Sequence, residues 1–259
     1  HSGRIPGSTG GRHHREPLFE TRVHRSCLSP FYVEELTGYN GPPFESKWRD
    51  VECRYPAYES DDAGPETFYH DNMLLTLAEH GANAIWIRGA LRHFAKVDVF
   101  PEFGEHSGEM LSALRDLCAR AADLGMKVFL YLNEPMGMDE DDPFWDAYPH
   151  VKGITVSFKP VSCMCTSAPE VKEYLQQASE YVFSEVPDLA GMILITASEY
   201  PSHCYCHSSR PDDEDELQKL IDEGEICPRC ADRTPQEVVI DIVDLLRKGA
   251  RTANPDAQV

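Results

Sequence analysis

The sequence predicts an α/β fold built around a parallel sheet, and three observations lead to this expectation. Segments with strand character alternate with amphipathic helical segments. The strand segments are continuously apolar, as in KVFLYL at 127–132 and GMILIT at 191–196. Several helical segments end at a glycine that leads directly into the next strand. Because parallel strands are joined by crossover helices, we expect both faces of the sheet to be buried.

The first half of the chain predicts three strands. Residues 1–17 are rich in Gly, His and Arg and are expected to form a flexible N-terminal arm. The first strand is expected at 19–25 and a long irregular loop up to about residue 65. A helix over 65–80 ends at Gly81, and the second strand covers 83–88. A helix from Ser107 keeps an apolar rhythm of three and four residues up to Gly125, and the third strand follows at 127–132.

The second half continues the alternation. A short strand is expected over 153–158, and Ser167-Ala-Pro-Glu170 predicts a capping box that starts the next helix. The fourth strand is expected at 191–196, followed by a cysteine-rich insertion at 200–233. Thr234-Pro-Gln-Glu237 predicts a second capping box, with a helix that ends at Gly249. Residues 255–259 are expected to begin a fifth strand.

Two closures of such a sheet are compatible with this order, an open doubly wound sheet and a (β/α)8 TIM-type barrel. Neither G-x-G-x-x-G after the first strand nor G-x-x-x-x-G-K-[ST] is present, which argues against a nucleotide-binding fold. The strands recur every ~60 residues, so eight units would exceed the ~250 residues of a typical barrel. We therefore expect residues 18–259 to be the N-terminal portion of a (β/α)8 catalytic domain, with about four βα units and the start of a fifth strand. The remaining half of the barrel or a partner chain would complete it.

Composition excludes some partners. The 24 Lys and Arg residues against 44 Asp and Glu residues leave a formal net charge of −20. This argues against nucleic acid, whose binding depends on basic residues, and against an anionic membrane surface. No apolar run is long enough for a membrane-spanning helix. Nine cysteines are an odd number without a disulfide-scaffold pattern, which favours a reducing compartment such as the cytoplasm.

Polar and aromatic side chains follow or end the predicted strands. In a parallel barrel, functional groups gather at the C-terminal ends of the strands. Carboxylates there suit glycosidic bond cleavage, aromatic rings can stack on sugars, and arginines can pair with hydroxyls or carboxylates. We expect Glu199 and Glu134 to be catalytic, with Glu134 alternatively a substrate-binding or loop-bracing residue. The candidates for substrate binding are Arg22, Arg25, Trp86, Arg88, Tyr131, Asn133 and Tyr200.

Three stretches carry a family resemblance: LGMKVFLYLNEP, SAPEVKEYL and VPDLAGMILITASE. Together they resemble strands three and four of family-20 β-N-acetylhexosaminidases and are similar to the family-67 α-glucuronidases. The resemblance implies a barrel glycoside hydrolase acting on a non-reducing-end sugar, with Glu199 as the general acid. Hexosaminidases carry Asp immediately before the acid, whereas this chain has Ser198. The resemblance therefore does not extend to substrate-assisted cleavage.

Two other classes of function are weighed against hydrolysis. A non-catalytic carbohydrate- or partner-binding barrel, with a metal loop as its interaction surface, fits the same pattern. A lyase or aldolase barrel is less favoured, because no lysine ends a strand to form a Schiff base.

The strongest local motif is a pair of cysteine clusters. Cys204-x-Cys206 is followed after twenty residues by Cys227-Pro-Arg-Cys230, a spacing typical of a tetrahedral Zn(Cys)4 site. Four protein ligands leave no open position, so this zinc is expected to be structural. Disulfides or free thiols are the alternative, and the flanking His203 or His207 could replace one cysteine.

Three further cysteines have no obvious role in this pattern. Cys27 follows the first strand, and Cys163-Met-Cys165 is a second C-x-C motif without a partner pair. We expect all three to be packing residues.

Overall fold

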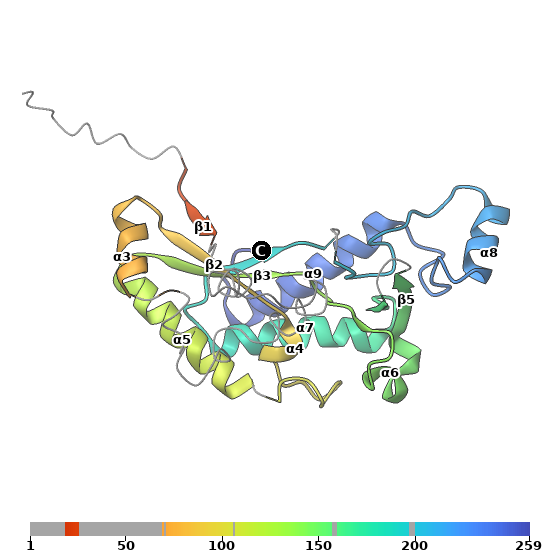
Figure 1. Cartoon of the computed structure of the whole chain (residues 1–259), viewed down its shortest axis with the longest axis horizontal. Helices are drawn as coiled ribbons and strands as arrows, with labels where there is room; N and C mark the ends of the chain where they lie inside the picture. The colour runs from red at the N-terminus through yellow and green to blue at the C-terminus, as the bar shows by residue number, and fades with distance from the viewer. Residues whose placement is uncertain (1–18, 26–68, 70, 106, 157–159, 197–199) are drawn as a thin grey trace, which may run out of the picture.

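The structure is a computed structural model that describes residues 19–25, 69, 71–105, 107–156, 160–196 and 200–259 (Figure 1). Several expectations fall outside these residues: the N-terminal arm at 1–17, the whole loop at 26–65 with Cys27, the first turn of the helix expected at 65–80, and the pair Ser198 and Glu199. These expectations stay predictions.

Four parallel strands form the main sheet. They are β1 (Val23–Arg25), β2 (Ala84–Gly89), β3 (Lys127–Leu132) and β7 (Gly191–Leu194), and they lie side by side in that order. Each neighbouring pair is parallel. Gln258 forms a parallel bridge to Gly191, so the fifth strand expected at 255–259 begins where the sequence predicts it. The strands thus follow one another across the sheet in chain order.

Four helices connect these strands: α3 (Asp71–Glu79), α5 (Ser107–Asp123), α7 (Pro169–Glu185) and α9 (Pro235–Ala253). Gly81 and Gly125, with φ angles of 89° and 69°, form the turns after α3 and α5, as glycine alone does readily. The buried sides of the helices belong to one apolar core with the strands. Within the described residues, no helix combines the length and the apolarity that crossing a bilayer requires.

The two faces of the sheet differ in burial, because the face opposite the helices has both buried residues, such as Phe129, and half-buried ones. Ile87 and Leu130 are partners across β2 and β3 and are buried against the helices. On the opposite face, Arg88, Tyr131 and Ile193 are partners across three strands and are only half-buried. The difference arises because α5, α7 and α9 share a single core on one side (Figure 1).

The start of α9 is as predicted, but its end is not. Glu237 N–H donates to Thr234 Oγ1 at 3.2 Å and Thr234 N–H donates to Glu237 Oε2 at 2.7 Å, which confirms the capping box. The helix does not stop at Gly249 and continues to Ala253. Gly249 is instead a close-approach point, because an added Cβ would lie 2.2 Å from the carbonyl oxygen of Gln176 in α7.

The capping box expected at 167–170 is also wrong. The N-cap of α7 is Ala168, and no side chain accepts a hydrogen bond at this end of the helix. Ser167 lies one residue earlier, and its hydroxyl contacts a cysteine and an arginine, as described below. The helix still begins with Pro169 in its first turn, where proline needs no N–H partner.

A second region lies at one end of the molecule, where Figure 1 shows β5, α6 and α8. Its small antiparallel sheet has the order β4-β6-β5. The sequence predicts only the strand at 153–158 here and misses the rest of this sheet. The elements of the region are β4 (Met138–Asp139), α6 (Phe144–Ala147), η2 (Pro149–Val151), β5 (Lys152–Val156), β6 (Val161–Met164) and α8 (Glu214–Asp222).

Candidate metal centre and sheet-edge site

Four buried cysteines from three separate segments meet in the second region. Cys165 directly follows β6, Cys204 lies in the segment after β7, and Cys227 and Cys230 lie in the turn after α8. Their sulfur atoms all lie within 4.8 Å of one another. Cys230 N–H donates to the carbonyl oxygen of Cys227 at 2.9 Å, so a tight turn places both thiols on one side. The group can therefore bind a metal ion.

The sulfur separations fit a tetrahedral thiolate site. Cys165 Sγ lies 3.6 Å from both Cys227 Sγ and Cys230 Sγ. A tetrahedron with metal–sulfur bonds of about 2.3 Å has edges of about 3.8 Å. The spacing of these thiols therefore leaves room for an ion of that size at their centre.

The fourth thiol of this group is Cys165, where the sequence predicts Cys206. Cys204, Cys227 and Cys230 are brought together as expected, but Cys206 Sγ lies 3.8 Å from Cys163 Sγ instead. Each C-x-C motif contributes one thiol to each cluster. Cys165 and Cys204 belong to the four-cysteine group, and Cys163 and Cys206 form a second pair. The expectation that Cys163 and Cys165 are packing residues is thus wrong for Cys165. The signal that could have identified it is the second C-x-C motif itself.

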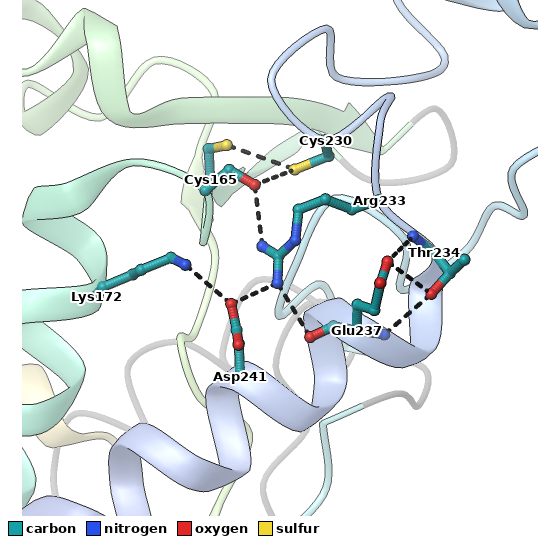
Figure 2. A network of polar contacts seen from close by, with 8 residues as sticks. Cys165, Lys172, Cys230, Arg233, Thr234, Glu237 and Asp241 are labelled. Atoms are coloured by element: carbon teal, nitrogen blue, oxygen red, sulfur yellow. Dashed lines mark hydrogen bonds and ion pairs between the residues drawn. The ribbon is translucent and has the colours of Figure 1, made fainter.

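Three side chains link the four-cysteine group to helices α7 and α9 (Figure 2). Ser167 Oγ lies 3.3 Å from Cys230 Sγ, and Arg233 Nη1 donates to Ser167 Oγ at 3.1 Å. Because the arginine occupies the oxygen as a donor, the serine hydroxyl hydrogen is available to the sulfur. Arg233 also pairs with Asp241 of α9. Such outer hydrogen bonds stabilise a thiolate and fix its orientation.

The carboxylate oxygen of Asp241 that pairs with Arg233 also pairs with a lysine of α7. Lys172 Nζ in α7 donates to Asp241 Oδ2 at 2.9 Å. The chain of contacts from Cys230 therefore ends on two helices whose other faces join the main core (Figure 2). The cysteine group and the parallel sheet are connected through these polar side chains.

Arg229 and Gly153 also lie against the four-cysteine group. Arg229 Nε donates to Cys165 Sγ at 3.3 Å, which places a positive charge beside the thiols. Hydrogen bonds from Cys204, Cys227 and Cys230 lower the pKa of Cys165 well below its usual range. Gly153 of β5 faces the group at close range, because an added Cβ would lie 2.6 Å from Cys204 Sγ.

The histidines beside the first cysteine pair are not members of the four-residue group. His203 is buried, and its Nδ1 accepts the N–H of Tyr205 at 3.1 Å. Burial lowers the pKa of His203 to about 4, so the ring is neutral. His207 is exposed. Among the described residues, the ligands that the geometry offers are therefore four thiols.

At the parallel sheet, three predicted substrate-binding residues do come together. The rings of Trp86 and Tyr131 stack with centroids 4.4 Å apart and an interplanar angle of 23°. The guanidinium carbon of Arg88 lies 5.5 Å from the centroid of the Tyr131 ring. All three are half-buried and lie on the face opposite the helices. We call these three residues the aromatic cluster.

Asn133 directly follows strand β3, and its side-chain oxygen is a hydrogen-bond acceptor without a donor among the described residues. The residue is 3% exposed, and its Oδ1 accepts no hydrogen bond within the described part of the chain. A buried polar atom without a partner is costly. This oxygen is therefore a candidate contact for a ligand hydroxyl.

Glu134 has a structural environment that fits the loop-bracing alternative. It is 1% exposed, and its two oxygens accept the backbone N–H groups of Leu91 at 2.6 Å and Met136 at 3.3 Å. Leu91 begins the short helix α4 (Leu91–Phe94), so the carboxyl ties that helix to the turn after β3. Burial raises the pKa of Glu134, although these two hydrogen bonds and nearby Arg92 act in the opposite direction.

Other predicted residues lie elsewhere. Arg22 precedes β1, and its side chain donates to the carbonyl oxygens of Gly81 and Phe19, at the edge where the strands begin rather than end. Tyr200 is buried, and its hydroxyl donates to Gly137 O at 3.2 Å. Arg25 is the last residue of β1 and pairs in register with Trp86. Glu199 lies outside the described residues, five positions after the end of β7.

Comparisons with known proteins add no relative. No protein-family model matches the chain, and no curated protein matches it.

Proposed function

We propose that this chain is a glycoside hydrolase of (β/α)8-barrel type, whose sugar binds near the C-terminal ends of the parallel strands, on the side of the sheet opposite helices α5, α7 and α9. The order of the strands supports the barrel, because consecutive parallel strands with all connecting helices on one side are typical of a singly wound sheet. A doubly wound sheet would place helices on both faces.

The observation that carries the sugar-binding proposal is the aromatic cluster. Trp86 and Tyr131 present stacked rings beside the cation of Arg88, on a face where side chains remain half-buried. Flat rings suit the apolar faces of pyranoses, and the guanidinium suits a carboxylate or a pair of hydroxyls. The unpartnered Oδ1 of Asn133 adds an acceptor at the end of the same strand.

In this proposal Glu199 is the general acid. It follows β7 in the sequence, and β7 is the neighbour of β3 in the sheet. Its carboxylic acid would protonate the leaving glycosidic oxygen, and an enclosed site would keep its pKa high enough to hold that proton. Glu134 would serve as a brace rather than as the second carboxylate, because both of its oxygens are occupied.

The test is hydrolysis of a panel of aryl glycosides by the full-length protein. Glu199→Gln should lower kcat by at least ~100-fold on the best substrate, the lower end of what general acid catalysis contributes. The matched control is Glu185→Gln, an exposed glutamate at the end of α7, which should retain activity. Equal turnover by the wild type and Glu199→Gln would refute this assignment.

A second candidate is a non-catalytic carbohydrate-binding barrel. The specific observation in its favour is the saturation of Glu134, which leaves no free carboxylate at the ends of β2 and β3 among the described residues. Calorimetric binding of a sugar by the wild type, without turnover of any aryl glycoside, would favour this candidate. Trp86→Ala should abolish binding under either candidate.

We also propose that the four-cysteine group holds one structural zinc ion. Four thiolates and no water satisfy the tetrahedral preference of zinc, and the ion would fasten the segment after β7 to the small antiparallel sheet. Elemental analysis of purified protein should find one zinc per chain. Protein that is folded through residues 200–233 and free of metal would contradict this.

A further inference from the structure

Two thiols remain beside the four-cysteine group. Cys163 Sγ and Cys206 Sγ lie 3.8 Å apart, and neither belongs to the group of possible metal ligands. They differ in accessibility: Cys163 is fully buried, whereas Cys206 is partly exposed. The pair therefore combines one partly exposed cysteine with one buried cysteine.

The placement of this pair follows from the two C-x-C motifs. β6 is extended, so Cys163 and the following Cys165 point to the same side of the chain, whereas Cys204 and Cys206 lie in a turn in which Cys206 N–H donates to the carbonyl oxygen of His203 at 3.1 Å. Cys165 and Cys204 meet in the four-cysteine group, and the outer residues Cys163 and Cys206 meet next to it. The pair joins β6 to the segment after β7 across 43 residues of sequence.

We propose that Cys163 and Cys206 are an oxidation site, which a hydroperoxide converts into a reversible disulfide while the four-cysteine group keeps its metal. A disulfide needs a sulfur separation of about 2.05 Å, so each sulfur must move by only about 0.9 Å. A rotation about the Cα–Cβ bond can supply such a shift. The inference is independent of the glycoside hydrolase proposal.

The reaction balances in two steps. Cys206 sulfur attacks one oxygen of hydrogen peroxide, the simplest hydroperoxide, and the O–O bond breaks. The departing hydroxide takes the Cys206 thiol proton, so the products are a sulfenic acid on Cys206 and one water. Cys163 sulfur then attacks the sulfur of that sulfenic acid. The S–S bond forms, the S–O bond breaks, and the departing hydroxide takes the Cys163 proton as a second water. A dithiol reductant reverses the change by thiol–disulfide exchange.

A second metal site is the competing use of these thiols, and the geometry disfavours it. Two thiols are too few for a tetrahedral site. Among the described residues, the only cluster of three or more potential ligands is the four-cysteine group. The nearby His203 uses Nδ1 as an acceptor for the Tyr205 N–H, and the ring belongs to no cluster of three or more potential ligands among these residues.

The experiment uses the metal-loaded protein treated with a small excess of hydrogen peroxide. Intact-mass analysis without reductant should show the loss of two hydrogens, and peptide mapping should join the Cys163 and Cys206 peptides. The metal content should stay unchanged, and dithiothreitol should restore the original mass. Cys206→Ser should prevent the disulfide, and Cys163→Ser should trap the sulfenic acid on Cys206, detected with dimedone.

The control is Cys118→Ala in α5, remote from the pair in sequence and buried, which should form the disulfide as the wild type does. Three results would overturn the proposal. One is the absence of any disulfide at peroxide levels that oxidise a free dithiol. Another is a disulfide that includes Cys165, Cys204, Cys227 or Cys230, with metal release. The third is a metal content of two per chain that falls to one in Cys206→Ser.

Discussion

The parallel-sheet region and the cysteine region of this protein are stabilised by different physical means. In the sheet region, β2, β3 and β7 bury one apolar face against three long helices, so the hydrophobic effect over a large continuous core provides the stability. The cysteine region, formed by the small antiparallel sheet and residues 200–233, adds short elements to the edge of the same core and relies in addition on thiols and on charged side chains such as Arg233. A change that is severe in one region should therefore be mild in the other.

The largest expected effect is in the cysteine region. Cys165→Ser should lower metal affinity by more than the 10–100-fold that the loss of an outer hydrogen-bond partner costs. It removes one of four thiol ligands, and residues 200–233 should lose their order because binding and local folding are linked. Metal content and limited proteolysis would measure both effects.

Cys206→Ser is the matched control for that change. Cys206 belongs to the same C-x-C motif as the ligand candidate Cys204 but lies outside the four-cysteine group. Its replacement should therefore leave one metal ion bound and the 200–233 segment intact. Metal loss in Cys206→Ser with retention in Cys165→Ser would reverse the ligand assignment.

The next effect concerns the sheet region alone. Gly249→Ala places a methyl group 2.2 Å from the Gln176 carbonyl oxygen, so α7 and α9 must separate. The free energy of unfolding should fall by about 1–3 kcal/mol, with the metal content unchanged. Gly108→Ala in α5, where nothing lies within 4 Å, should be neutral or slightly stabilising. Urea titrations that gave both variants the same stability would contradict this close approach.

A smaller effect should cross from one region to the other. Ser167→Ala removes the hydroxyl between Cys230 and Arg233, and metal affinity should fall about 10-fold. Competition with a chromophoric chelator would measure it, and Ser184→Ala on the exposed side of α7 is the control. If Ser167→Ala bound metal like the wild type, the polar connection would have no role in holding the ion.

The smallest effect is a pH dependence in the sheet region. Burial raises the pKa of Glu134 in the folded protein, so the folded state binds this proton more tightly than the unfolded state does. This contribution is fully present below the unfolded pKa and is lost as pH rises through the folded pKa. Glu134→Gln leaves one N–H without an acceptor and should cost about 1–3 kcal/mol in acid.

The cost of Glu134→Gln should then shrink as pH rises, because only the wild-type carboxyl must ionise in its buried position. Urea unfolding of the two proteins at several pH values would measure the difference. A constant gap across the acid range would show that the carboxyl does not titrate differently in the folded protein.

The contrast between the regions also explains what the sequence could predict. The strands at 84–89, 127–132 and 191–194 and the helix 107–123 follow from local periodicity, because each buries the side that its own pattern marks as apolar. Arg22 was misplaced because strand boundaries are the weakest part of such reasoning. Its position before β1, rather than after it, sends the side chain to the opposite edge of the sheet.

The fourth cysteine depends on tertiary structure. Cys165 lies 65 residues from Cys230, and only the pairing of β6 with its neighbours brings it to the group. Spacing alone favoured Cys206, which lies two residues after Cys204 in the same C-x-C motif. Ser167 was predicted as a helix cap from its local pattern, but a nearby thiol and Arg233 compete for its hydroxyl. Glu199 stays a prediction from sequence and resemblance.

The ligand order along the chain sets the sequence of events during folding. The turn that holds Cys227 and Cys230 is local, so a chain that refolds can present these two thiols early. Cys204 and Cys165 come from segments 23 and 62 residues away from Cys227, and they reach the turn only after β6 and β7 have formed. Capture of an ion by all four thiols would therefore be a late step of folding, and retention of the proposed metal would distinguish a correctly assembled molecule from a misfolded one.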